Sequence, residues 1–77
     1  MRIKGDRGSV TFDMGNGYVA EAMGEMLIGR KFVAEVRSMK YWNPPHQNER
    51  ITPEQIEWIK SEVKKWMNEN TMQIIFE

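Results

Sequence analysis

The clearest periodic pattern in the sequence lies between residues 53 and 69, where apolar positions recur every three or four residues. Polar residues such as Lys60 and Lys64 fall on the opposite side, which is typical of a helix that packs one face on a core. The apolar stripe comprises Ile56, Ile59, Val63, Trp66 and Met67. The pattern predicts a helix over about 53–69, with Trp66 in the core.

The start of this helix is marked by the sequence Thr-Pro-Glu-Gln at 52–55. Thr52 is a favoured N-cap, proline suits the first helical position, and Gln55 completes a capping box. Ile51 and Ile56 stand at the two positions of a hydrophobic staple. The helix is therefore expected to begin at Pro53.

Alternation with a period of two predicts a β-hairpin in the first third of the chain. Polar and apolar side chains alternate over residues 9–14, which is typical of a strand with one buried face. The Gly-Asn-Gly sequence at 15–17 contains the Asn-Gly pair that favours a two-residue hairpin turn. The return strand is expected over about 18–23.

A two-residue turn also determines which side chains share a face of the hairpin. It places Tyr18, Ala20 and Ala22 on the same face as Thr11 and Asp13. The side chains that it places on the apolar face are Val10, Phe12, Met14, Val19, Glu21 and Met23. The pairing of the two strands tests this register.

Further strands are predicted over about 32–39 and 71–77, while residues 25–28 either continue the second strand or form a short one of their own. Ile75 faces away from the apolar side of the last strand, so this strand is expected to be buried on both faces. The order of elements predicts a single α+β domain over residues 1–77. Its mainly antiparallel sheet has four to five strands, with one helix packed on one face.

Composition narrows the possible functions. The chain has 77 residues, equal numbers of basic and acidic residues (11 each) and no cysteine. The lack of cysteine excludes a disulfide framework, a thiolate nucleophile and a cysteine-based zinc site. It also favours a cytoplasmic location, and no apolar run approaches the length that spans a membrane.

A catalytic or metal centre is not expected. His46 is the only histidine, and with Glu49 it offers at most two ligands, whereas a zinc site needs three or four. No serine lies in a nucleophile-elbow sequence. The sequence therefore predicts no catalytic, cofactor-binding or metal-binding residue, and we expect a non-enzymatic protein.

Aromatic residues outside the apolar stripe indicate a protein-binding role. Trp58 lies far from the stripe, so it is either covered by the loop 41–51 or exposed as a binding anchor, since tryptophan, tyrosine and arginine dominate interface hot spots. Trp42 precedes two prolines in a stiff segment that is either a lid on the core or a rigid recognition element. The partner-binding candidates are Arg37, Tyr41, Trp42, His46 and Trp58.

Two other classes of binding module stay open. Basic and aromatic residues over 30–42 allow a small nucleic-acid-binding or regulatory module, but the zero net charge and Glu35 weigh against nucleic acid. The other class is a subunit that forms a homodimer through a sheet edge. Neither needs a cofactor.

Four short motifs resemble those of a family of small α+β immunity proteins from bacterial polymorphic toxin systems. They are Gly-Glu-Met-Leu at 24–27, Ser-Met-Lys-Tyr-Trp-Asn-Pro-Pro at 38–45, Ile-Thr at 51–52 and Ile-Ile-Phe at 74–76. The resemblance covers nearly the whole chain. It implies a protein that binds and blocks a cognate toxin domain, and it assigns no binding residues.

Overall fold

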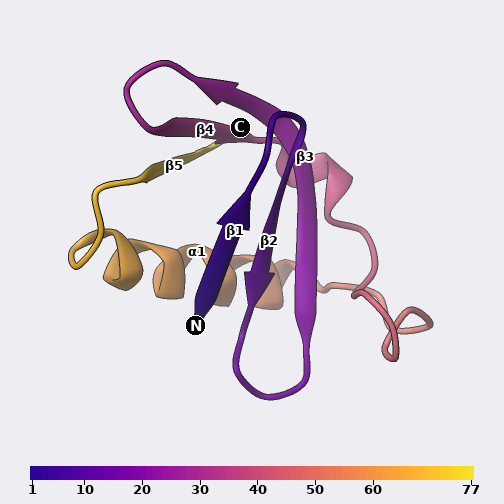
Figure 1. The fold of residues 1–77 in the computed structure, drawn as a ribbon. Helices are drawn as coiled ribbons and strands as arrows, with labels where there is room; N and C mark the ends of the chain where they lie inside the picture. The colour runs from indigo at the N-terminus through magenta and orange to yellow at the C-terminus, as the bar shows by residue number, and fades with distance from the viewer.

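The computed structural model describes all 77 residues, and it shows one helix lying across one face of a five-stranded sheet (Figure 1). The elements in chain order are β1 (Arg2–Gly5), β2 (Ser9–Asp13), β3 (Val19–Leu27), β4 (Lys31–Ala34), the short 3₁₀ helix η1 (Val36–Ser38), α1 (Pro53–Met67) and β5 (Gln73–Phe76). The strands follow the order β1-β2-β3-β4-β5, and all neighbours are antiparallel except β4 and β5. The predicted α+β fold is confirmed.

The predicted register of the first hairpin is wrong by one residue. Phe12 faces Ala20, and Met14 donates a backbone hydrogen bond to Tyr18 over 3.0 Å, so the turn has three residues rather than two. Ala20 therefore shares the buried face with Phe12. A one-residue change in register moves every side chain of a strand to the other face.

Glycine at both ends of the turn explains the longer loop. Gly15 and Gly17 have φ values of 86° and 90°, in the left-handed region that L side chains rarely adopt. The Asp13 carboxylate accepts a hydrogen bond from the Gly15 N–H at 3.0 Å, and the Asn16 side-chain oxygen accepts one from the Tyr18 N–H at 3.1 Å. These local bonds satisfy the backbone of a three-residue loop.

The sequence pattern did not predict the edge strand β1. Ile3 is its only large apolar residue, so no alternation of polar and apolar residues is visible there. It pairs antiparallel with β2, with Ile3 opposite Phe12. The turn between them is held by Asp6, whose carboxylate accepts hydrogen bonds from the N–H groups of Gly8 and Ser9 at 3.1 and 3.0 Å. These backbone hydrogen bonds lower the pKa of Asp6.

The strand β3 is long enough to join both parts of the sheet. It pairs with β2 in its first half and with β4 in its second half, and it bends between the two (Figure 1). Residues 25–27 thus continue the second strand, which was one of the two alternatives. At the bend a side chain on Gly24 would collide with the Val33 carbonyl oxygen and the Phe32 ring.

The predicted strand over 32–39 is too long, since β4 ends at Ala34 and η1 follows. Ser38 accounts for the change of direction. Its hydroxyl donates to the Glu35 carbonyl oxygen at 2.6 Å and accepts from the Met23 N–H at 2.8 Å. A side chain that bonds to nearby backbone competes with strand pairing in this way.

The core lies between the sheet and α1. Its thirteen buried residues are all apolar: Val10, Phe12, Ala20, Ala22, Phe32, Ala34, Met39, Trp42, Ile51, Ile56, Ile59, Val63 and Ile74. The capping box predicted for α1 is confirmed, because Gln55 N–H donates to the Thr52 hydroxyl at 3.1 Å and Thr52 N–H donates to the Gln55 side chain at 2.9 Å. No helix is both long and apolar enough to cross a membrane.

Two predictions about burial are wrong. Trp66 is only partly buried and lies outside the core, beside Met1 in a surface hollow. It stands at the margin of the apolar stripe, whose centre passes through Ile59 and Val63. Ile75 is 39% exposed, because β5 is an edge strand and α1 covers only one face of the sheet.

Candidate partner-binding surfaces

The segment between η1 and α1 forms a closed loop that is fixed to the sheet. Ile51 N–H donates to the Lys40 carbonyl at 2.9 Å, and Trp42 N–H donates to the Glu49 carbonyl at 3.2 Å. Asn43 N–H donates to the carbonyl of Val19, the first residue of β3, at 2.8 Å. These bonds hold both ends of the loop and tie it to the start of β3.

A polar cluster fixes the same loop through its side chains. The Tyr18 hydroxyl lies 2.9 and 3.1 Å from the two carboxylate oxygens of Glu49, and the His46 Nδ1 lies 2.7 Å from Glu49 Oε2. The His46 ring stacks on the Tyr18 ring with centroids 3.7 Å apart. The hydrogen bond from Tyr18, followed by the one with His46, lowers the pKa of Glu49, while the bond to Glu49 raises the pKa of Tyr18.

Trp42, one of the partner-binding candidates, anchors the loop in the core and is not available on the surface. It is 2% exposed and meets the Tyr18 ring edge-on, with centroids 5.1 Å apart. Its indole Nε1 has no hydrogen-bond partner. The segment that contains Trp42 was expected to be either a lid on the core or a rigid recognition element. The burial of Trp42 supports the lid.

The other four predicted residues differ in exposure and in the residues that they contact. Tyr41 is 51% exposed, with the Arg50 guanidinium 5.9 Å from its ring centroid. Arg37 is exposed on η1, whereas His46 is partly buried against Tyr18.

Trp58 is 39% exposed on α1, so the alternative of an exposed indole holds. No hydrogen bond, ion pair or ring contact joins Trp58, Tyr41 or Arg37 to one another.

The cluster of Tyr18, His46 and Glu49 does not line any of the hollows on the surface. No group of three or more histidine, cysteine, aspartate or glutamate side chains is arranged to hold a metal ion. The cluster therefore serves to fix the loop 41–50 against β3.

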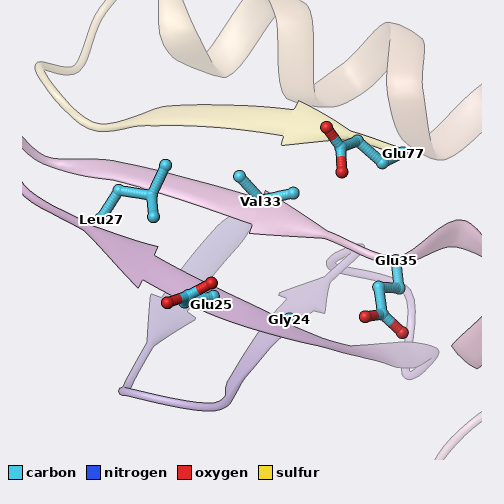
Figure 2. A pocket seen from close by; sticks show the side chains of 6 residues that line it. All are labelled: Gly24, Glu25, Leu27, Val33, Glu35 and Glu77. Atoms are coloured by element: carbon cyan, nitrogen blue, oxygen red, sulfur yellow. The ribbon is translucent and has the colours of Figure 1, made fainter.

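The sheet face that α1 leaves uncovered carries a hollow of about 490 Å³. Figure 2 shows the side chains around it, which come from β3, β4 and the ends of β4 and β5. They belong to Glu25, Leu27, Val33, Glu35 and Glu77, and Gly24 forms part of the floor. The sequence analysis did not predict this surface. The pattern that could have indicated it is an acidic and an apolar residue two positions apart, in 25–27 and again in 33–35.

The fold defines a small α+β protein with one helix on one face of a five-stranded sheet. Residues 2–77 match the family described as Immunity protein 74, and the chain belongs to that family. The resemblance inferred from the sequence motifs is thereby confirmed. No curated protein and no solved structure gives a significant match.

Proposed function

We propose that this chain is a single-domain immunity protein that binds a cognate bacterial toxin domain and blocks it by covering its active surface. The observation that carries this proposal is the family match over residues 2–77. The protein acts by binding alone, and it does so in the cytoplasm of the bacterium that makes the toxin.

The structure supports binding rather than chemistry. The one histidine, His46, is engaged by Glu49 and Tyr18 away from any hollow. Acid–base catalysis needs a group within hydrogen-bond reach of a bound substrate. By contrast, Arg37, Tyr41 and Trp58 expose side chains of the types that dominate binding interfaces. These three residues are therefore candidates for the toxin contact.

Coexpression tests the proposal. The proposal predicts that a toxin domain is encoded beside this protein's gene. That domain is induced in bacteria with and without this protein, and growth is expected only when both are made. The purified pair should elute together from a size-exclusion column. A toxin that still stops growth in the presence of abundant, folded protein contradicts the proposed function.

A further inference from the structure

The two faces of the sheet differ in how they are covered. The inner face packs on α1 and supplies Phe12, Phe32 and Ile74 to the core. The outer face of β3, β4 and β5 has nothing packed on it, yet it presents Leu27, Val33 and Ile75. An antiparallel sheet with one solvated face normally carries polar residues there. Apolar side chains in that position indicate a surface that another molecule covers.

These apolar residues are neighbours across the strands. Val33 on β4 stands opposite Glu25 on β3 and Ile75 on β5, so its side chain shares a face with both. Leu27 lies two residues further along β3 on the same face, and the adjacent Ile28 at the β3–β4 turn is 98% exposed. The apolar surface therefore continues from the sheet to the turn.

Carboxylates border this surface on the side away from the turn. Glu25, Glu35 and Glu77 surround the hollow over Val33 (Figure 2), and none of the three forms an ion pair. Lys31, opposite Leu27 near the turn, is the one basic residue on this part of the face. The surface thus combines an apolar centre with an acidic border whose charges have no partner within the chain.

We propose that the outer face of β3, β4 and β5 is the docking surface for the toxin domain, and that it accepts a basic protein surface with apolar side chains at its centre. This inference rests on the proposed function and adds the site and the chemistry of the partner. Lysine or arginine side chains of the partner would meet the three carboxylates, while its apolar residues would cover Leu27, Val33 and Ile75. Opposite charges at the border guide association and fix orientation, and burial of the apolar centre supplies affinity.

Other occupants fit this face less well. In a symmetric dimer the same patch would meet itself, so the three carboxylates would face one another with a single lysine to offset them. Nucleic acid carries phosphates that the carboxylates repel. A standard interface needs ~800 Å² from each side, so in a molecule of 35 × 22 × 19 Å the contact with a protein partner would extend beyond these strands over most of one broad face.

Two sets of variants test the charges of the border. Glu25, Glu35 and Glu77 are all changed to glutamine in one protein. In a matched control, Glu54 and Glu57 on α1 and Glu69 just after it are all changed to glutamine. Both proteins lose the same number of carboxylates, so their net charges are equal and only the position of the lost charges differs. Thermal unfolding confirms that both remain folded.

Binding to the purified toxin domain encoded beside this gene is measured by calorimetry at low and high salt. The variant that lacks the border carboxylates is expected to bind at least ~10-fold more weakly at low salt and to lose most of the salt dependence, because screened charges act mainly at low ionic strength. The control is expected to bind like the unchanged protein. In the apolar centre, Leu27→Ser combined with Ile75→Ser is expected to weaken binding by ~10-fold or more at either salt.

The outcomes separate the two proposals. If the unchanged protein does not bind the toxin domain, both the proposed function and this inference are wrong. If it binds, but the border and centre variants bind equally well, the function stands and the docking surface is wrong. The docking surface is also wrong if only Arg37→Ala or Trp58→Ala weakens toxin binding. It is wrong as well if the unchanged protein is a dimer and the Leu27 and Ile75 changes convert it to a monomer.

Discussion

The Tyr18 hydroxyl lies 2.9 Å from one carboxylate oxygen of Glu49 and 3.1 Å from the other, across 31 positions of the sequence. This contact joins the start of β3 to the far end of the loop 41–50. With Trp42 buried beneath Tyr18 and His46 stacked on it, the loop becomes part of the folded domain rather than a free segment. Its geometry has a measurable consequence for stability at low and high pH.

The first prediction concerns that pH dependence. The folded state lowers the pKa of Glu49 from its ordinary value of 4.5, chiefly through the Tyr18 hydroxyl and then through His46. The resulting stabilisation is present above the ordinary value and is lost as pH falls through the folded-state pKa. The raised pKa of Tyr18 acts at the other end, where the stabilisation is present below its ordinary value of 10.0 and is lost at more alkaline pH.

Tyr18→Phe keeps the ring contacts and removes only the hydroxyl. Urea unfolding at pH values across both ranges is expected to show a smaller loss of stability in acid and in alkali for this variant than for the unchanged protein. Asp6 titrates in acid independently of Tyr18, so part of the acid loss remains in both. Identical pH profiles for the two proteins would show that the contact between Tyr18 and Glu49 does not form in solution.

The second prediction concerns the close approach of β3 and β4. Gly24→Ala is expected to destabilise the domain by at least ~2 kcal/mol, because the added methyl group meets the Val33 carbonyl oxygen and the Phe32 ring, and backbone cannot move aside cheaply. Gly8→Ala is the matched control, since a methyl group there meets no atom within 4 Å. Equal unfolding free energies for the two variants would mean that the strands are further apart than described.

The third prediction distinguishes two tryptophans. Trp42→Ala is expected to cost ~3–5 kcal/mol, because it empties a fully packed site in the core. Trp66→Ala is expected to cost under ~2 kcal/mol, since that side chain lies partly in solvent at the end of α1. Denaturant unfolding measures both changes, and the reverse order of the two values would contradict the position of the loop 41–50.

The fourth prediction concerns the start of α1. Thr52→Ala removes the side-chain oxygen that accepts from the Gln55 N–H and is expected to cost ~1 kcal/mol. For a domain of this length, this lowers the melting temperature by ~4–8 °C. Thr52→Ser keeps the oxygen and should unfold near the temperature of the unchanged protein. A serine variant as unstable as the alanine variant would assign the loss to the methyl group instead of the cap.

The helix was predictable because its signals are local. The capping box at Thr52 and Gln55 depends on residues three positions apart, and both predicted hydrogen bonds form. The hairpin was predictable as an element but not in register, because two- and three-residue turns share the same Gly-Asn-Gly sequence. The difference depends on the left-handed backbone at both Gly15 and Gly17 and on the apolar residues that the core selects.

The binding candidates show a different limit of sequence reasoning. Trp42 and Trp66 are both tryptophans near apolar residues, and their burial is decided by contacts that are distant in sequence. Trp42 is enclosed because Tyr18 packs against it, while Trp66 lies at the margin of the helix stripe, in a surface hollow lined also by Met1, Glu62, Lys65 and Glu69. The acidic and apolar face of β3–β5 depends on which strands are neighbours, and the parallel pairing of β4 with β5 is not visible in either strand alone.

A fifth prediction separates binding from catalysis at the one histidine. His46→Ala is expected to leave protection against the toxin nearly unchanged, because His46 packs on Tyr18 and lines none of the surface hollows in which an acid or base would reach a bound substrate. Growth of cells that coexpress the variant and the toxin measures this. Loss of protection by a variant that is folded and still binds the toxin would indicate that His46 takes part in a reaction.

The central claim is that this protein blocks a toxin domain by occupying it. The most direct test is to titrate a fixed amount of the active toxin domain with this protein and to measure the remaining toxin activity. Inhibition by occupation predicts that activity falls in proportion to added protein and ends near one equivalent, with no further change over time. Complete inactivation by a small fraction of an equivalent, or full activity at a large excess of folded protein, would contradict it.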